Sequence, residues 1–313
     1  MLSYIVRRLA AGVVLLFVIS GIAYATMFLS GGDIARRLLG QMATEDQVAA
    51  KAGELGLDEP LVTRYFDWLG SALGGDFGRS WFTGEPVAQA LENRLPVTLT
   101  LVIGTTLVVA VVSVLLGTAA AVRRGWLDRA VQLLSVAGYA LPGFWIALLL
   151  ALVVAVELGW FPATGYVPFS LSVAGWLSTI TLPIAALSIG AVASTTQQVR
   201  GAMIDVLRQD YIRTLRSRGL PRHRVLLRHA LRNASGPGLT VLALQFIGLM
   251  GGAVFVEQIF ALPGIGLLAV NATTRGDIPM VMGVVVVTVV LVTVVNLLID
   301  IAVGFLNPKA RVR

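Results

Sequence analysis

The sequence has no cysteine and only two histidines, and charged residues make up 13% of its 313 residues. Without cysteine there can be no disulfide framework and no thiolate metal site. His223 and His229 have no third metal ligand near them in the sequence, so we predict no metal site. The sequence also lacks a Gly-x4-Gly-Lys-Ser/Thr phosphate loop, so we expect that this chain does not bind ATP itself.

The apolar segments lack the groups that an enzyme buried in a membrane would need. They contain no paired acids, no histidine cluster and no nucleophile with a neighbouring base. We therefore predict no catalytic residue. An intramembrane enzyme is an alternative that the sequence disfavours.

Long apolar runs take the place of the missing charge. Hydrophobic residues make up 57% of the chain, and the charged fraction is well below the roughly 25% of an average soluble globule. A helix needs about 20 apolar residues to cross a bilayer, and irregular backbone cannot face lipid. We therefore predict an all-α polytopic membrane protein with six transmembrane helices. The predicted spans are about residues 9–30, 97–122, 131–156, 172–197, 236–256 and 280–305.

The distribution of charge indicates how these spans are oriented. Residues 198–235 carry nine arginines and two aspartates, a net charge of +7. Arg7 and Arg8 precede the first span, which we expect to remain uncleaved, and the loop 123–130 and the tail 307–313 are also basic. The alternate loops are acidic, so the positive-inside rule predicts both termini in the cytoplasm. Because this topology accounts for the basic residues, we infer no nucleic-acid binding from them.

The longest predicted loop, residues 31–96, has the pattern of a folded outer segment. Thr44 followed by Gln47 is typical of a capped helix start. The apolar face of a second short helix is formed by Leu61, Tyr65, Trp68 and Leu69. Two interpretations stay open, a cap on the outer membrane face and a surface that receives a soluble delivery protein. The predicted parts of the chain are then residues 1–30, 31–96, 97–306 and 307–313.

The loop between the fourth and fifth spans, about residues 205–235, has the pattern of a helix, a turn and a second helix. The first helix is predicted from Asp205 to Arg218, and Gly219 stands where a left-handed cap would end it. A second helix is predicted from Arg222. Its apolar face is formed by Leu227, Ala230, Leu231 and Ala234. Arginines on such a helix attract anionic membrane lipid, but a lipid-binding helix needs no turn, which favours the docking of a soluble partner.

The candidates to line a polar pathway through the membrane are Gln197, Gln198, Gln245 and Asn271. They are chosen as uncharged amides at or near the spans, which could meet a zwitterionic group. Pro142 and Pro183 predict breaks or kinks in two of the spans. A docking or gating role for Glu257, just outside the fifth span, is a further hypothesis.

Several motifs, in order along the chain, resemble those of the dipeptide/oligopeptide permeases, a family of ABC importer permeases. The run Asp210-Tyr-Ile-Arg-Thr-Leu-Arg-Ser-Arg-Gly219-Leu-Pro is similar to their cytoplasmic "EAA" loop. Further matching motifs are His229-Ala-Leu-Arg-Asn233, Gly56-Leu-Asp-Glu-Pro60, Gly75-Asp-Phe-Gly-Arg-Ser80 and Val256-Glu-Gln-Ile-Phe-Ala-Leu-Pro-Gly264. The resemblance covers nearly the whole chain and is closest to the B-type permease of a B/C pair.

The resemblance implies a permease subunit of an ATP-driven importer of short peptides, in the bacterial plasma membrane. It implies as partners a second homologous permease, two ATPase subunits that hold ATP and Mg²⁺, and an extracytoplasmic substrate-binding protein. In the family, the first helix of the loop is a coupling helix that docks on the ATPase. Carried over to this chain, the docking residues are Tyr211, Arg213, Thr214, Leu215, Arg216, Arg218 and Gly219. Leu215 is bulkier than the alanine usual at its position in the peptide permeases.

The mechanism that follows from the resemblance is alternating access, with this chain forming half of the translocation pathway. The same family also moves nickel chelates, haem and glutathione, and the sequence does not choose among these solutes. A sensory or regulatory membrane protein, whose basic loop docks a signalling partner, is an alternative from another class.

Overall fold

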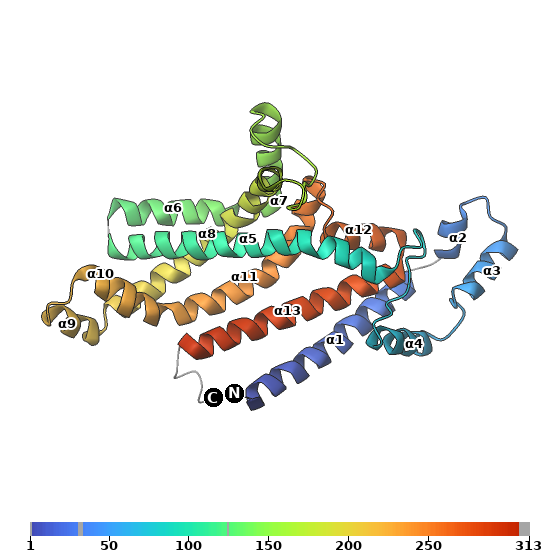
Figure 1. Ribbon diagram of the computed structural model, residues 1–313, viewed down its shortest axis with the longest axis horizontal. Helices are drawn as coiled ribbons and strands as arrows, with labels where there is room; N and C mark the ends of the chain where they lie inside the picture. Colours follow the sequence, from blue (N-terminus) through green and yellow to red (C-terminus); the bar gives the residue numbers. More distant parts are fainter. Residues whose placement is uncertain (1, 31–33, 124, 307–313) are drawn as a thin grey trace. The chain divides into compact units, whose positions relative to one another are not determined.

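The computed structural model describes residues 2–30, 34–123 and 125–306, and the protein is helical over these residues (Figure 1). Within them the only extended pairing is an isolated bridge between Arg79 and Pro86. The predicted all-α class is therefore confirmed. The chain forms two compact units. Unit 1 contains residues 98–262 and 294–306, and unit 2 contains residues 2–97 and 263–293.

Unit 1 is built around the long helix α8 (Val173–Leu207), which packs against α6, α7 and α11. Gly117 of α5 lies so close to α8 that an added Cβ would be 2.9 Å from the Val199 side chain. Only glycine therefore fits at this crossing without a shift of α5 or α8. Unit 1 contains the C-terminal part of α5 (Val87–Val122), α6 (Trp126–Ala140), α7 (Gly143–Leu149), the π-helix η1 (Leu150–Glu157), α8, α9 (Asp210–Ser217), α10 (Arg222–Arg224), the π-helix η2 (Val225–Ala230) and α11 (Leu231–Ile259).

Unit 2 has a core of its own, which includes Tyr24, Val87, Leu268 and Met282. The ring of Tyr24 lies edge-on to that of Tyr65, with the centroids 5.6 Å apart. Unit 2 contains α1 (Leu2–Ser30), α2 (Ile34–Leu39), α3 (Glu45–Glu54), α4 (Leu61–Leu73), the first part of α5, α12 (Ile265–Arg275) and the first part of α13 (Ile278–Leu306).

Four described helices are long and apolar enough to span a membrane. These stretches are Val6–Leu29, Val87–Val122, Val173–Leu207 and Ile278–Ile299. Helix α6 together with α7 and η1 makes a fifth if this bent pair is one span. All six predicted spans fall on helices, but the apolar part of α11, Leu244–Ile259, is shorter than the others. The span predicted at residues 236–256 therefore stays a prediction.

The two intramembrane prolines have different effects. At Pro142 the chain bends by 94° between α6 and α7, and the preceding residue, Leu141, is extended. A residue before proline disfavours the helical conformation, so the predicted break is confirmed here. Pro183 instead lies within an unbroken α8, where Leu182 and Pro183 are both buried. No break occurs at this second proline, and a kink there stays a prediction.

The local predictions for the segment after α1 are confirmed. Thr44 caps α3, its hydroxyl accepts from the N–H of Gln47, and the Gln47 side chain accepts from the N–H of Thr44, which completes a capping box. On α4, Leu69 is buried, and Leu61, Tyr65 and Trp68 pack against the unit 2 core. Residues 31–33 and the predicted tail 307–313 lie outside the described residues.

Candidate functional site

The predicted docking helix is α9, which ends in a hydrogen-bonded turn. Gly219 has a φ of +78°, in the left-handed region, and its N–H donates to the carbonyl of Arg216 at 3.0 Å. The N–H of Leu220 donates to the carbonyl of Leu215 at 3.3 Å. These two bonds form a Schellman motif, which closes a helix and satisfies its last carbonyl groups. The predicted left-handed cap at Gly219 is therefore confirmed.

One face of α9 is packed into unit 1. Ile212 is fully buried, and Leu215 is half-buried one turn later. Both belong to a cluster with Met203 of α8, which Leu220 joins from beyond the turn. The bulky Leu215 therefore fills space in the chain's own core as well as lying on the predicted docking helix.

The opposite face of α9 is exposed and basic. The other predicted docking residues are all exposed, namely Tyr211, Arg213, Thr214, Arg216, Arg218 and Gly219. Arg213 lies 3.6 Å from Asp210, with both side chains more than three-quarters exposed. Such a solvent-exposed pair contributes little to stability and leaves Arg213 open to another anion.

Helix α9 is also tied to the start of α11. The Asn233 Nδ2 donates to the Tyr211 hydroxyl at 2.7 Å. Ala234 of α11 is buried in the same cluster as Ile212. Packed side chains and one hydrogen bond thus join α9 to α8 and α11.

The predicted continuous helix from Asp205 to Arg218 is wrong. Helix α8 ends at Leu207, and Gln209 is extended, with φ −67° and ψ 145°. The absence of proline and glycine permits a helix but does not require one. Because the chain turns at Gln209, Ile212 reaches the cluster around Met203.

The second predicted helix does begin at Arg222, but it passes through η2 before it continues as α11. A π-helix has a wider turn than an α-helix, so side chains five positions apart align. Val225 and Ala230 are accordingly buried together, whereas Leu227 is 65% exposed. The predicted apolar face is therefore wrong at Leu227 and holds at Ala230 and Ala234.

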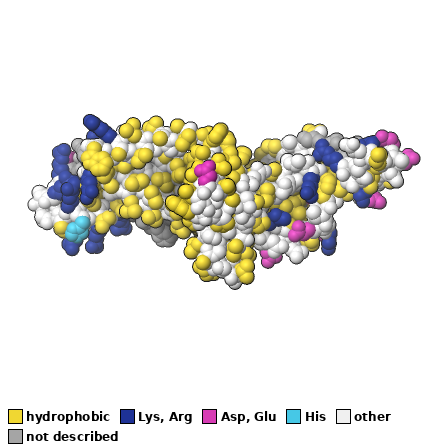
Figure 2. Space-filling view, turned by 90° about the horizontal axis from the view of Figure 1, so that it is seen from above, with side chains coloured by type: hydrophobic (Ala, Val, Ile, Leu, Met, Phe, Trp, Pro, Cys, Tyr) yellow, Lys and Arg dark blue, Asp and Glu magenta, His cyan; other side chains and the backbone are white. Residues whose placement is uncertain are grey.

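Three arginines line a cavity of about 320 Å³ beside α9. They come from the end of α8, from α9 and from α10, and they are Arg208, Arg216 and Arg222. The remaining lining residues are Ala121, Val122, Leu207 and Leu226, so none of the seven carries a carboxylate. Figure 2 shows Lys and Arg side chains gathered over this end of unit 1. The cavity suits an anion. Within the described part of the chain, no group of three or more His, Asp or Glu side chains is placed to hold a metal ion.

The predicted pathway residues are distributed over three helices. Gln197 and Gln198 lie on α8, half-buried and exposed respectively, and Gln245 lies half-buried on α11. These two helices pack against each other within unit 1. Asn271 lies exposed on α12, in unit 2. A pathway role for the four amides stays a prediction.

Two polar contacts in unit 1, one partly buried and one buried, join residues that are distant in the sequence. Asp128 of α6 accepts two hydrogen bonds from Arg200 of α8, at 2.5 and 2.9 Å. Glu257 of α11 is fully buried and accepts from the Thr98 hydroxyl at 2.6 Å. The sequence analysis missed both pairs, because 72 and 159 positions separate the partners and no local pattern relates them.

Comparison with protein families gives two matches that together cover nearly the whole chain. Residues 113–312 match the family described as the binding-protein-dependent transport system inner membrane component. Residues 1–102 match the N-terminal family of the same transport system membrane component.

Three relatives illustrate the similarity to individual proteins. A putative peptide transport system permease protein of Brucella abortus is 38% identical, over 99% of both chains. An oligopeptide transport system permease protein of Bacillus subtilis is 34% identical, and a glutathione transport system permease protein of Escherichia coli is 33% identical. Both of these matches also cover 99% of this chain and 99% of the relative.

Proposed function

Because this chain belongs to the family of binding-protein-dependent transport system inner membrane components, we propose that it is the permease subunit of an ATP-driven importer of short peptides. The observation that carries the proposal is the similarity, over the full length of the chain, to permeases named for peptide transport. The family is a membrane component of a transport system, and the sequence holds no phosphate loop. ATP and Mg²⁺ would accordingly be held by separate ATPase subunits.

Helix α9 is the element that we propose docks on such an ATPase. Its exposed face carries Arg213 and Arg216, and its buried face is packed against α8. A groove on the partner that engages the exposed face would therefore move the inner ends of α8 and α11 as it moves α9. This is the link that alternating access requires, in which the spans open first to one side of the membrane and then to the other.

The rest of the proposed assembly follows from the family to which the chain belongs. A second homologous permease would supply the other half of the pathway, and a substrate-binding protein would deliver the solute outside the cell. Both termini and α9 would lie in the cytoplasm, as the basic loops predict. Gln197, Gln198 and Gln245 of unit 1, together with Asn271 of unit 2, are the proposed pathway residues. Anionic membrane lipid would contact the remaining arginines at the inner surface.

Glutathione is the second candidate solute, because one full-length relative is named as a glutathione transport system permease. Glutathione is itself a tripeptide, so the two candidates differ in side chain and linkage rather than in class. Uptake of a radiolabelled dipeptide and of radiolabelled glutathione, each in competition with the other compound unlabelled, would decide between them. Uptake of glutathione that unlabelled dipeptides do not inhibit, with no uptake of the dipeptide, would assign glutathione as the solute.

The docking proposal can be tested by cross-linking, which this chain favours because it has no cysteine of its own. A Thr214→Cys variant places one thiol on the exposed face of α9, and Thr63→Cys places one on α4 as a matched exposed control. With a short thiol-to-amine cross-linker in native membranes, we expect only the first variant to capture an ATP-hydrolysing subunit. Capture by neither variant, in membranes that transport peptide, would refute the role of α9.

A further inference from the structure

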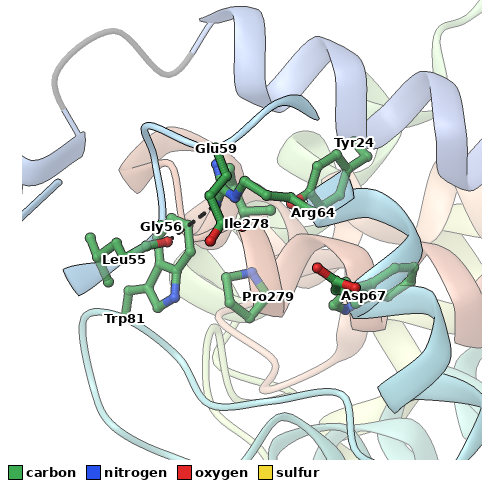
Figure 3. A pocket seen from close by; sticks show the side chains of 10 residues that line it. Tyr24, Leu55, Gly56, Glu59, Arg64, Asp67, Trp81, Ile278 and Pro279 are labelled. Carbon is green, nitrogen blue, oxygen red and sulfur yellow. Dashed lines mark hydrogen bonds between the residues drawn. The ribbon is translucent and has the colours of Figure 1, made fainter. Parts of the chain in front are cut away.

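Unit 2 contains a cavity of about 230 Å³ whose walls carry charges of both signs (Figure 3). This volume holds roughly eight water molecules at about 30 Å³ each. It is smaller than the roughly 300–1,000 Å³ of sites for drug-sized ligands, so it suits a small molecule. The lining residues are Tyr24, Leu55, Gly56, Glu59, Arg64, Asp67, Trp68, Trp81, Ile278 and Pro279.

Two residues that line this cavity each carry a buried nitrogen that has no hydrogen-bond partner among the described residues. Arg64 of α4 is only 8% exposed, and its Nη1 makes no hydrogen bond to any described residue. Its Nη2 donates to the Leu55 carbonyl at 3.4 Å, which is long for such a bond (Figure 3). The buried Nε1 of Trp68 likewise has no partner among the described residues. Buried polar groups are normally satisfied, so two unpaired donors at one cavity point to a missing acceptor.

The charge of Arg64 makes an anionic acceptor the favoured one. The guanidinium lies 5.1 Å from the centre of the Phe28 ring, but no carboxylate of the described residues is within ion-pair distance of it. A buried cation without a counter-ion is costly, and a carboxylate satisfies both nitrogens of a guanidinium edge.

Two acidic side chains give the cavity negative charge in addition to the positive charge of Arg64. Glu59 and Asp67 also line it, and both are exposed. They disfavour an acidic protein surface as the occupant, because like charges would meet at the entrance. They favour a ligand that carries an ammonium group as well as a carboxylate.

We propose that this cavity is a binding site for a small zwitterion of amino-acid size. Its carboxylate binds Arg64 and the Trp68 N–H, its ammonium group faces Glu59 and Asp67, and its side chain packs against Trp81. The inference does not rest on the proposed function, because the cavity lies wholly in unit 2 and α9 lies in unit 1. The site differs from the pathway residues of unit 1.

Calorimetric titration of the full-length chain in lipid nanodiscs, with L-leucine as the probe, tests the proposal. We expect saturable binding of L-leucine and at least about tenfold weaker binding of L-leucine amide, which lacks the carboxylate. N-acetyl-L-leucine, which lacks the ammonium group, should bind about two- to fivefold more weakly than L-leucine. No saturable binding of L-leucine, or equal binding of the amide, would overturn the proposal.

Substitutions of the lining residues test whether L-leucine binds in this cavity. Asp67→Asn should weaken the binding of L-leucine about two- to fivefold and leave the binding of N-acetyl-L-leucine unchanged. Asp58→Asn is the matched control, because Asp58 is exposed on the same segment but does not line the cavity. Arg64→Gln should abolish L-leucine binding in protein that still unfolds cooperatively at an unchanged temperature. If the Arg64→Gln variant does not fold, the comparison of Asp67→Asn with Asp58→Asn decides. If neither Asp67→Asn nor Arg64→Gln changes L-leucine binding, the ligand binds elsewhere and the proposed site is refuted. Binding of a glutamate-rich peptide in place of L-leucine would make it a protein-docking surface instead, which also refutes the proposal.

Discussion

Gly219 sets the direction of the chain after α9, and its backbone conformation excludes most other residues. At a φ of +78° a β-branched side chain meets its own backbone, at a cost of about 1–2 kcal/mol. We predict that Gly219→Val opens the turn, displaces α9 and abolishes solute uptake while membrane insertion stays normal. Uptake of labelled peptide by cells with equal amounts of the variant in their membranes is the measurement.

Gly40 provides the control for that substitution. It also has a positive φ, +90°, and no atom lies within 4 Å of an added Cβ, as at Gly219. Gly40→Val therefore imposes similar strain at a site far along the chain from α9. Normal uptake by Gly219→Val, or equal loss of uptake by both variants, would contradict the assignment of the turn.

Asp277 anchors the segment that precedes α5 within unit 2. It is 4% exposed and accepts hydrogen bonds from the Ser80 hydroxyl at 2.5 Å and from the Trp81 N–H at 3.2 Å. Asp277→Ala leaves both donors unpaired, and we expect the free energy of unfolding to fall by about 3 kcal/mol. Denaturant unfolding in detergent, followed by tryptophan fluorescence, measures the change.

The matched control is Asp76→Ala. Asp76 accepts a single bond, from the N–H of Gly78, and is exposed on its loop. Its loss should cost less than about 1 kcal/mol. Equal effects of the two substitutions would show that the contacts of Asp277 do not stabilise unit 2.

At the scale of residues, local chemistry could be predicted and distant pairing could not. Thr44 with Gln47 and the cap at Gly219 depend only on neighbours within a few positions. Asp277 and Ser80 are 197 positions apart, so nothing beside either residue indicates the other. Arg64 resembles any other arginine of an amphipathic helix until its burial is known.

Among the elements, one ion pair joins α6 to α8 in addition to their packing. Asp128 and Arg200 are mostly buried, with side chains 17% and 21% exposed. In a double-mutant cycle with Asp128→Asn and Arg200→Gln, we expect a coupling energy of about 1–3 kcal/mol. Thermal unfolding of the wild type, both single variants and the double variant gives this energy.

The exposed pair of Arg213 and Asp210 is the reference for that cycle. Their nearest charged atoms are 3.6 Å apart and both side chains are largely in solvent, so their coupling should be close to zero. Coupling of the same size in both pairs would mean that burial of the first pair adds nothing.

The existence of the helices could be predicted from the sequence, but their breaks and phases could not. The apolar runs identified all six long helical segments. Pro142 ends a helix and Pro183 does not, although both follow leucine, because burial around Pro183 opposes the local preference. The π turn of η2 also shifts the face on which Leu227 lies, and no periodicity in the sequence indicates the extra residue.

For the whole molecule, the distribution of charge predicts which surfaces face the cell interior. A membrane-impermeant maleimide added to intact spheroplasts should label Thr63→Cys on α4 and leave Ser217→Cys on α9 unlabelled. Both variants should label after the membrane is permeabilised. Because the unaltered chain has no cysteine, it gives the background of the assay. Labelling of Ser217→Cys in intact spheroplasts would reverse the orientation.

The division into two compact units could not be predicted from the sequence, which suggested a boundary near residue 96. In the structure α5 and α13 each contribute to both units, and residues 263–293 join the N-terminal part of the chain. Composition distinguishes apolar from polar segments but carries no information on which distant segments pack together.

The Schellman turn at Gly219 bears on whether α9 can bind and release a partner repeatedly. The carbonyls of Thr214, Leu215 and Arg216 are satisfied within the chain, and the packing of Ile212 and Leu215 holds α9 in place without another subunit. A partner that grips α9 therefore meets an element that is already ordered, and association costs little conformational entropy there. Such a contact can form and dissolve in every turnover as a rigid-body event, without refolding.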